Sequence, residues 1–447
     1  MPPGGKGRSL SRFRCRTSGV CPLPRSPLGS VRLRRTAPRR NAGGDPEWDN
    51  ITMKFMKKTF YAISIFLLLG IQSSPDPLKL HFDALVVDTH NDVCQRILAG
   101  EDISVRTRHG HSDLPRFKEG GLDVECFSIW VPPEDTARSY FDQANEMIDS
   151  VESLARRNPD KMGMAMSSAD IERLAGEGRF VGMLGIEGGH PIGGDIEKLK
   201  YFYRRGVRYL TLTWNNSTGW ATSAADEEDP GNSRRHKGLT LHGREIVRAM
   251  NDMGMIVDVS HVGERTFWDV IRTTTKPIIA SHSSAWALCH HRRNLKDAQL
   301  KAIAANGGVV FINFFPAFID STFIRKEAAM TARNRHRIDS LRNTIRGNDF
   351  LKTQYVAEQM KAEYDSIRPP LKMLIDHFDY VAKLIGADHV GIGSDFDGIT
   401  VAPRDMDDVT FLPNITRELL KRGYSPGDVK KILGGNFMRV LKANEKR

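Results

Sequence analysis

Histidines and carboxylates that could bind metal ions follow short apolar runs at widely separated points of the chain. His90 and Asp92 form an H-x-D pair after LVVDT, and Glu187 stands in GIEGGH. His261 and His282 end the segments DVSH and IASH. Imidazole nitrogens and carboxylate oxygens are ligands that suit zinc. If these five side chains meet, they would repel one another or stay unsatisfied without a cation, so they predict a centre for two zinc ions.

The spacing of these residues suggests individual roles. Alternate residues of a strand point to one face, so His90 and Asp92 can reach the same metal. Glycines follow Glu187 and let the backbone approach closely, and its two carboxylate oxygens make it the candidate bridge between the metals. In GIGSDFDG, Asp395 lies nearest the predicted strand and is the candidate general base and acid, whereas a simple Asp-Gly turn explains Asp397.

The elements that must position these side chains are eight apolar runs, rich in valine, isoleucine and leucine and bounded by glycine or proline. Such runs are typical of buried parallel strands, and amphipathic helical patterns such as 240–253 and 371–385 lie between them. The pattern predicts a (β/α)8 TIM barrel of the metal-dependent hydrolase type, with a doubly wound open sheet as the alternative. In a barrel the carboxyl ends of all strands meet at one face, which would bring the ligands together. The predicted strands are 85–90, 122–131, 180–188, 207–214, 255–261, 277–282, 308–315 and 389–395.

One segment, 316–369, exceeds what a minimal barrel needs. It follows the seventh predicted strand, is strongly charged and has a helical pattern around 349–366. An insertion in a βα loop hangs over the mouth of a barrel, so we expect a helical lid, a dimer contact or a solvated excursion. The barrel domain as a whole is predicted to span 83–442.

The N-terminal region has two parts of different composition. Residues 1–52 are rich in arginine, proline, glycine and serine and lack hydrophobic periodicity, which predicts a disordered basic tail. Residues 53–74 have the charged start, apolar stretch and small polar end of a secretory signal. Because such a signal begins a protein, Met53 or Met56 is the predicted start and the tail an upstream mis-start, with a targeting tail as the alternative. We therefore predict export to the periplasm or the extracellular space, with no stable membrane span after cleavage and membrane association if the signal is retained.

The formal net charge of +11 is confined to this N-terminal region. Residues 1–52 contain 11 Lys and Arg against 3 Asp and Glu, and 53–72 add three lysines, whereas the rest of the chain has 51 residues of each sign. A neutral folded body argues against nucleic acid as a partner. Three of the five cysteines lie beyond the tail and are isolated, which fits neither a disulfide framework nor a thiolate zinc site and allows one bridge at most.

Over roughly residues 83–442 the chain resembles the membrane (renal) dipeptidases, zinc dipeptidases of the amidohydrolase superfamily. The resemblance implies a first zinc on His90 and Asp92, with Glu187 as the bridging ligand. It implies a second zinc on His261 and His282, and it suggests a homodimer. The segments that carry the resemblance are VVDTHND, GIEGGHPI, RYLTLTWN, GMIVDVSHV, IIASHSSAWALCHHRRN, HVGIGSDFDG and GGNFMRVL.

The resemblance also implies which residues handle the substrate. It makes Asp395 the catalytic acid and base, and Arg293 the arginine that holds the terminal carboxylate of the substrate, for which a guanidinium fork is well suited. The fourth strand of the family usually ends in LTLTH, where the histidine helps orient the substrate and its tetrahedral intermediate, but here Trp214 stands at that position. Indole cannot accept a hydrogen bond or carry charge at neutral pH, which puts activity or substrate range in question. Asn215 or Asn216 as a replacement donor, a reshaped pocket wall and plain core packing are the alternatives.

These observations together predict an exported zinc-dependent dipeptidase in which a hydroxide between two zinc ions attacks the peptide bond of a dipeptide. Another amidohydrolase activity, on an N-acyl amino acid, a lactone or a cyclic amide, is the first alternative, and a substrate panel separates the two. A non-catalytic zinc-binding barrel, which Trp214 would explain, predicts bound metal without turnover. An exported structural protein predicts no metal.

Overall fold

The structure is a computed structural model in which residues 76–446 are described, except 233–235 and 346–348. The predicted tail, 1–52, and the predicted signal, 53–74, lie outside the described residues. Within the described ranges, no helix combines the length and apolar character that crossing a membrane requires. Cys94, Cys126 and Cys289 are buried free thiols.

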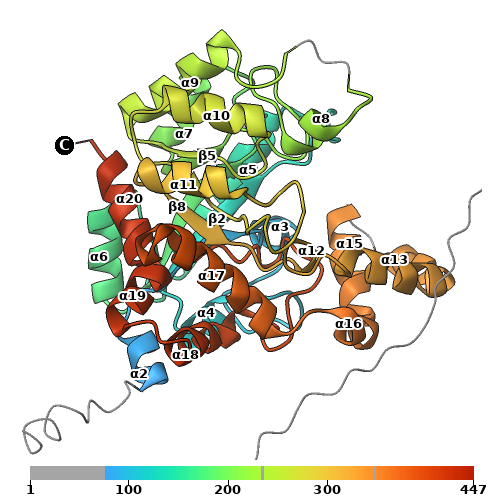
Figure 1. The fold of residues 1–447 in the computed structure, drawn as a ribbon. Coiled ribbons are helices and arrows are strands. Elements are labelled where there is room, and N and C mark those ends of the chain that lie inside the picture. The colour runs from blue at the N-terminus through green and yellow to red at the C-terminus, as the bar shows by residue number, and fades with distance from the viewer. Residues whose placement is uncertain (1–75, 233–235, 346–348, 447) are drawn as a thin grey trace, which may run out of the picture. The chain divides into compact units, whose positions relative to one another are not determined.

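Eight parallel strands close into a barrel surrounded by helices (Figure 1). The ring strands are β1 (Val87–Asn91), β2 (Val124–Trp130), β4 (Phe180–Glu187), β5 (Val207–Thr211), β6 (Ile256–Asp258), β7 (Ile279–Ala280), β8 (Val309–Ile312) and β9 (Val390–Ile392). They follow one another around the ring in this order, with β2 paired to β4 and β9 paired to β1. The predicted (β/α)8 barrel is thereby confirmed. A short additional strand that the sequence did not predict, β3 (Met162–Met164), pairs with β4 outside the ring.

Helices connect successive ring strands and pack on the outside of the barrel. They are α3 (Cys94–Leu98), α4 (Leu114–Glu119), α5 (Tyr140–Arg157), α6 (Ser168–Gly176), α7 (Ile196–Arg204), α8 (Ala224–Glu228), α9 (Leu241–Met253), α10 (Glu264–Thr273), α11 (Asp297–Ala305) and α17 (Leu371–Ile385). In α17, Leu374, Phe378 and Val381 recur at helical spacing and are buried, which explains why this segment forms an amphipathic helix. The terminal helices are α2 (Pro77–Phe82) before β1 and α18 (Pro413–Lys421), α19 (Pro426–Lys430) and α20 (Asn436–Asn444) after β9.

Side chains inside the barrel pack closely just below its mouth. Met183, Gly185 and Glu187 are alternate residues of β4, and Met183 lies in a buried cluster with Tyr209. A Cβ atom on Gly185 would lie 1.9 Å from the Tyr209 ring, so glycine is required where this ring crosses the barrel. The crossing ring brings the Tyr209 hydroxyl to 3.4 Å from His90 Nδ1. Packing below the mouth thus supports a side chain predicted to bind metal.

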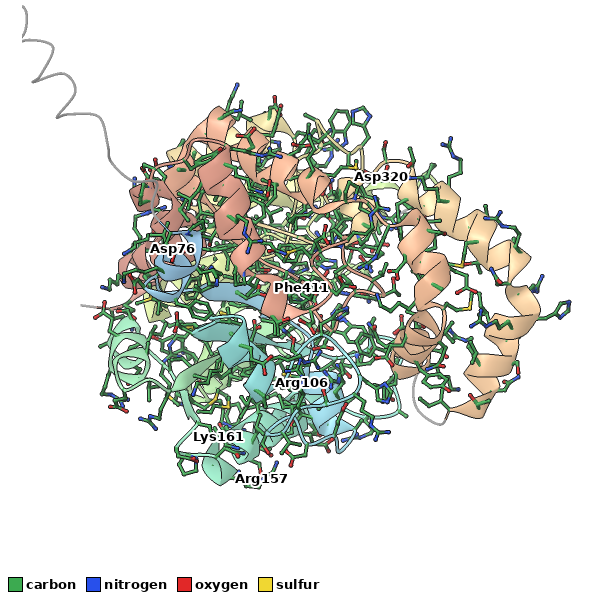
Figure 2. The ribbon with its side chains drawn as sticks, turned by 90° about the horizontal axis from the view of Figure 1, so that it is seen from below. Asp76, Arg106, Arg157, Lys161, Asp320 and Phe411 are labelled. Atoms are coloured by element: carbon green, nitrogen blue, oxygen red, sulfur yellow. The ribbon has the colours of Figure 1, made fainter. Side chains whose placement is uncertain are left out.

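The segment between β8 and α17 is helical, as predicted. It contains α12 (Pro316–Ile319), α13 (Phe323–Arg333), α14 (Arg335–Thr344), α15 (Asp349–Gln359) and α16 (Lys361–Ile367). In Figure 1, α13, α15 and α16 lie together beside the helices of the barrel, and they share a small apolar cluster that includes Phe323, Met330 and Met360. Asp320, labelled in Figure 2, marks the end of α12 and accepts hydrogen bonds from the Thr322 amide and from Lys326.

Several strands end before the residues that the sequence placed at their tips. β6 ends at Asp258 rather than His261, β5 at Thr211 rather than Trp214, and β9 at Ile392 rather than Asp395. His261 and Asp395 have φ angles of 66° and 63°, which lie in the left-handed region and are incompatible with an extended strand. Trp214, His261 and Asp395 therefore stand in the βα loops just beyond the ladder of the barrel, whereas His90 and Glu187 lie within β1 and β4.

Candidate metal centre

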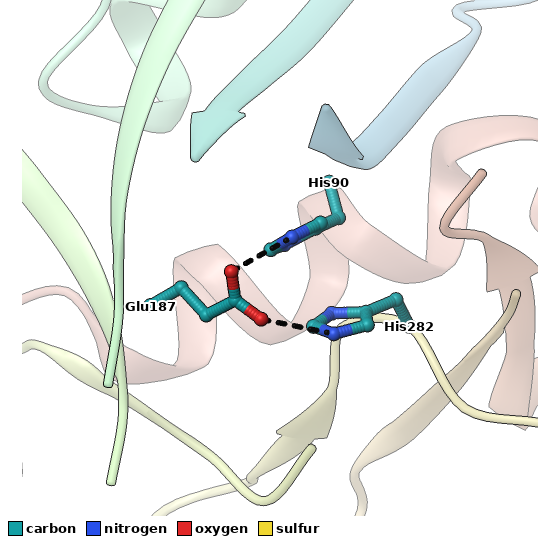
Figure 3. A group of neighbouring side chains, drawn as sticks. All are labelled: His90, Glu187 and His282. Carbon is teal, nitrogen blue, oxygen red and sulfur yellow. Dashed lines mark ion pairs between the residues drawn. The ribbon is translucent and has the colours of Figure 1, made fainter. Parts of the chain in front are cut away.

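The carboxylate of Glu187 is the centre of a group of imidazoles at the barrel mouth (Figure 3). Glu187 Oε1 lies 2.8 Å from His261 Nε2 and 3.4 Å from His282 Nε2. Glu187 Oε2 lies 3.5 Å from His90 Nε2, which is itself 3.5 Å from Asp92 Oδ2. The two oxygens of one carboxylate therefore face two different sets of ligands, which is the arrangement that a bridging residue requires.

A hydrogen-bonded chain orients His282. Its Nδ1 lies 2.8 Å from Ser281 Oγ, and the Ser281 hydroxyl donates to Asp258 Oδ2 at 2.6 Å. Asp258 is fully buried and also accepts from the Ser281 amide at 2.9 Å and from Thr211 Oγ1 at 2.5 Å. Because the serine donates to Asp258, its oxygen accepts the Nδ1 proton of His282. That tautomer leaves the lone pair of Nε2 facing Glu187.

The other two imidazoles are oriented in the same sense. His261 Nδ1 lies 3.1 Å from Asn215 Oδ1, an acceptor, so His261 donates there. The Tyr209 hydroxyl donates to the carbonyl oxygen of Thr89 at 2.9 Å and can therefore accept from His90 Nδ1. Each histidine thus uses its Nδ1 proton on a partner away from the centre and presents Nε2 to Glu187. This is the usual arrangement of histidines that bind a metal through Nε2.

The buried carboxylates of the centre are not neutralised by the histidines His261 and His282. Burial, together with the nearby Arg293, lowers the pKa of His261 to about 3. Burial, with His90 alongside, also holds the pKa of His282 well below its ordinary value, so both imidazoles are neutral at neutral pH. Burial opposes charge on His90 as well, but the Glu187 and neighbouring carboxylates outweigh it and hold the His90 pKa well above its ordinary value. The carboxylates therefore need a cation between them, which a proton or a metal ion can supply.

Several atoms of the centre have ligand character and lack a partner within the described part of the chain. His90 Nε2 and Asp92 Oδ1 are buried and make no hydrogen bond there. His261 Nε2 and His282 Nε2 face each other at 3.0 Å, although both are lone-pair positions in the tautomers above. Ligand atoms of His90, Asp92 and Asp395 also lie within 4.8 Å of one another. Divalent cations would satisfy these atoms, and the nitrogen and oxygen donors fit zinc.

Asp395 lies beside the centre and differs from the other carboxylates in its surroundings. Its amide donates to the carbonyl oxygen of His90 at 3.0 Å, and its Oδ2 accepts from Asn313 Nδ2 at 2.9 Å. Burial raises the pKa of Asp395 to about 7, with His90 opposing the rise and Asp92 adding to it. A Cβ atom on Gly398 would lie within 2.4 Å of both Asp92 Oδ2 and Asp395 Oδ1, so this glycine makes room for the two carboxylates. Asp395 therefore has the position and proton affinity of an acid and base.

Asp397 turns away from this group. It is itself a left-handed residue, with φ at 61°, two positions after the left-handed Asp395, so strand alternation fails here. Its Oδ1 accepts from Arg96 Nη1 at 3.1 Å and from the His111 amide at 2.8 Å. Two groups of described side chains could hold a metal, one of His90, Glu187 and His282 and one of His90, Asp92 and Asp395. Asp397 belongs to neither group. Its buried contacts tie the loop after β9 to the loop after β1.

A cavity of about 210 Å³ opens above the centre. Arg293 borders it, and its Nη2 donates to the carbonyl oxygen of His282 at 3.2 Å. Burial lowers the pKa of Arg293 to about 10, which still leaves the guanidinium positive at neutral pH. Arg293 Nε is buried and has no partner among the residues described. The cavity is lined by Asp92, Trp130, Glu187, Trp214, Asn215, His261, Arg293, Phe315, Phe318, Phe350, Asp395, Gly398, Ile399 and Thr400.

Trp214 is a wall of this cavity and is half-buried, which argues against plain core packing. Its ring lies 5.1 Å from the Trp130 ring and stacks on His261 at 6.2 Å between centroids. Asn215 also borders the cavity, whereas Asn216 makes a hydrogen bond of 3.0 Å to His190 Nε2. Of the two asparagines suggested as replacement donors, Asn215 is the one that faces the site.

The structure brings together all of the predicted site residues and adds others that sequence reasoning missed. Asp258 and Asn313 hold His282 and Asp395, and their signal was a polar residue inside the apolar runs MIVDVS and VVFINF. Trp130 and Phe350 line the cavity but gave no signal, because aromatic residues after a strand or on a helix are ordinary in any fold.

Comparison with known proteins agrees with this geometry. Residues 78–447 match the membrane dipeptidase family, peptidase family M19. The chain belongs to this family. Membership places it among the dipeptidases, which are hydrolases of the metallopeptidase type.

Relatives with known sequences and structures cover most of the chain. It is 34% identical to dipeptidase aclJ of Aspergillus oryzae over 341 residues, which cover 74% of this chain and 70% of the relative. It is 32% identical to dipeptidase verJ of Clonostachys rogersoniana, with 82% of this chain and 86% of the relative covered. Among solved structures, the probable dipeptidase PvdM of Pseudomonas aeruginosa matches with a TM-score of 0.68 and 27% identity, over 83% of this chain and 97% of PvdM. A metallo peptidase of Rhodobacter sphaeroides, liganded with a phosphinate mimic of the dipeptide L-Ala-D-Ala, matches with a TM-score of 0.64 and 26% identity, over 81% and 99% of the two chains.

Proposed function

We propose that this chain is an exported dipeptidase that holds two zinc ions on either side of Glu187. The observation that carries the proposal is the division of the Glu187 carboxylate, with Oε2 toward His90 and Oε1 toward His261 and His282. His90 and Asp92 with Oε2 would hold one ion. The remaining two histidines with Oε1 would hold the other. Export rests on the signal-like composition of residues 53–74.

The protein side chains would divide the chemistry between them. When bound, the two ions polarise the scissile carbonyl and lower the pKa of the attacking water toward neutrality. Asp395 accepts the proton of that water at Oδ1, because its Oδ2 is engaged by Asn313. The same carboxyl then donates the proton to the leaving amine. With its Oδ2 held by Asn313, this one carboxyl keeps a fixed position for both proton transfers.

Arg293 would restrict the enzyme to short peptides. Its guanidinium borders the cavity and is fixed by the His282 carbonyl oxygen and by Ser283 Oγ at 3.4 Å. The free C-terminal carboxylate of a dipeptide would pair here with the buried guanidinium of Arg293. A longer peptide would place an uncharged amide at the same point. The cavity is also smaller than the roughly 300–1,000 Å³ that drug-sized ligands occupy, which suits a dipeptide.

The family usually has a histidine at the position of Trp214. Asn215 would take over part of the role of that histidine in this chain. Its Oδ1 accepts from His261, so its amide nitrogen is the atom that remains for a substrate oxygen. A neutral amide donor stabilises developing negative charge on oxygen without titrating. The site therefore keeps a donor next to the position where indole replaces imidazole.

The direct test combines metal analysis with a substrate panel. Zinc bound per chain is measured by mass spectrometry, and hydrolysis of Ala-Gly and of L-Ala-D-Ala is measured beside the amide Ala-Gly-NH2. We expect two zinc ions, turnover of free dipeptides that stops when a chelator removes the metal, and little turnover of the amide. Zinc binding with no turnover of any dipeptide would instead indicate a non-catalytic barrel. Equal turnover of the dipeptide and its amide would contradict the role of Arg293.

A further inference from the structure

Three aromatic rings, those of Trp130, Trp214 and Phe350, form one side of the cavity, called here the aromatic wall. We propose that the aromatic wall binds the side chain of the N-terminal residue of the dipeptide and makes the enzyme selective for aromatic and large apolar residues there. The inference rests on the proposed dipeptidase function and names its substrate class.

The wall is assembled from three distant segments. Trp130 is the last residue of β2, Trp214 follows β5, and Phe350 lies on α15. The Trp130 ring is 5.1 Å from the Trp214 ring and 5.9 Å from the Phe350 ring, with interplanar angles of 52° and 43°. Rings tilted in this way around one edge of a cavity present both faces and edges to a ligand, as favourable aromatic contacts require.

The topology of the barrel says which end of a dipeptide meets the wall. In the ring of eight strands, β2 and β7 stand on opposite sides. Trp130 ends β2, whereas Arg293 belongs to the segment that follows β7, and Glu187 lies beside the cavity they share. A dipeptide with its carboxylate on Arg293 and its peptide bond over Glu187 must therefore extend its N-terminal residue toward Trp130.

Another aromatic side chain belongs to the opposite end. Phe318 of α12 lies under the guanidinium of Arg293, with Cζ 5.3 Å from the ring centroid. Its ring also packs against His291 at 4.5 Å. Phe318 therefore holds the carboxylate clamp, and a variant there would affect all dipeptides. The aromatic wall is the part of the cavity that can distinguish N-terminal side chains.

Trp214 adds to this selectivity because of what it replaces. A histidine at this position would put a polar, titratable ring beside the substrate, whereas indole gives a larger apolar surface. Trp214 is half-buried, so part of its ring is still available to a ligand. The substitution thus turns a polar edge of the cavity into a continuation of the Trp130 ring.

The experiment measures kcat/KM of the zinc-loaded enzyme for Phe-Gly and Ala-Gly, and for the reversed pair Gly-Phe and Gly-Ala. We expect wild type to favour Phe-Gly over Ala-Gly by about tenfold or more, the order expected when a hydrophobic pocket loses a large apolar group. Trp130→Ala should remove most of this preference. Phe350→Ala should also reduce the preference for Phe-Gly. Phe350 lies on a half-exposed helix outside the barrel, so we expect the barrel to stay intact without this ring. Neither variant should change the ratio between Gly-Phe and Gly-Ala.

Phe82→Ala is the matched control, because Phe82 is an exposed ring on α2, away from the cavity. It should keep the wild-type preference. Equal kcat/KM for Phe-Gly and Ala-Gly in wild type would overturn the inference while leaving the dipeptidase function in place. So would a Trp130→Ala variant that lost both activities equally, as expected if the rings bound the substrate backbone. Zinc-loaded enzyme with no turnover of any dipeptide would overturn the proposed function and this inference with it.

Discussion

The floor of the cavity and its aromatic wall are built in opposite ways. The floor consists of side chains at or just beyond strand ends, such as Glu187 and His282, and they are almost completely buried. The wall takes Trp214 from a loop and Phe350 from the insertion, and both rings are half-buried. On the proposed function, the chemistry would therefore depend on the barrel itself, whereas substrate choice would depend on elements attached to it.

The two regions also differ in how strongly each side chain is held. On the floor, every imidazole has a hydrogen-bond acceptor behind it, for example Ser281 and Asp258 behind His282. A buried polar group has few satisfied arrangements, so a change on the floor should disturb the metal ions. The rings of the wall meet through apolar contacts alone, so a change there should alter substrate preference and leave the metals bound.

The largest effect is expected from Asp395→Asn on the floor. The amide keeps the size of the side chain and the contact to Asn313 but cannot shuttle a proton, so kcat should fall by about 10²–10⁴-fold. The zinc content should stay at the wild-type value. Steady-state kinetics and metal analysis of the same preparation check both points. A variant with nearly full activity would remove Asp395 from the mechanism.

An intermediate effect is expected from Asp258→Asn, one step behind the floor. The change weakens the acceptor of Ser281 and so loosens the tautomer of His282, and zinc affinity should fall by about 10–100-fold. Titration against a competing chelator measures this affinity. Asp397→Asn is the matched control, since Asp397 is equally buried but bonds to Arg96. The same loss of affinity in both variants would show that general destabilisation, rather than the hydrogen bond from Ser281 to Asp258, is responsible.

The smallest effect is expected from Trp214→His on the wall. Imidazole is smaller and more polar than indole, so the preference for Phe-Gly over Ala-Gly should fall by about fivefold. Turnover of Ala-Gly should rise, because the protonated imidazole can donate a charge-assisted hydrogen bond to the developing oxyanion, whereas indole donates only as a neutral group. The zinc content should not change. A loss of zinc in this variant would contradict the independence of the aromatic wall from the metal-binding floor.

The barrel and the grouping of the floor residues could be predicted from the sequence because each predicted ligand comes at the end of an apolar run. Glu187 follows FVGMLGI and His282 follows PIIAS, and parallel packing alone brings such ends together. The predicted ends of the last five ring strands, β5 to β9, were too late by two or three residues, whereas those of β1, β2 and β4 were within one residue. His261 and Asp395 take left-handed backbone angles that no strand pattern signals, and their side chains reach the centre from loops.

The wall could not be read in the same way. Trp130 looks like one more apolar residue of a strand, and Phe350 like one face of a charged helix. The contact between the Trp130 and Phe350 rings depends on how the insertion packs against the barrel. Such a long-range contact leaves no local pattern in the sequence. Trp214 was noticed only because it departs from the LTLTH ending of the resembling family. Asp258 could be seen as a charged residue inside an apolar run, but its partner Ser281 lies just beyond the next strand, β7.

Anomalous diffraction at the zinc edge from crystals of the zinc-loaded protein tests the central claim most directly. We expect two peaks at the barrel mouth, one between Glu187 Oε2, His90 and Asp92, and one between Glu187 Oε1, His261 and His282. A single peak would contradict the claim that Glu187 bridges two zinc ions. Two peaks of which Glu187 contacts only one, or neither, would contradict it as well.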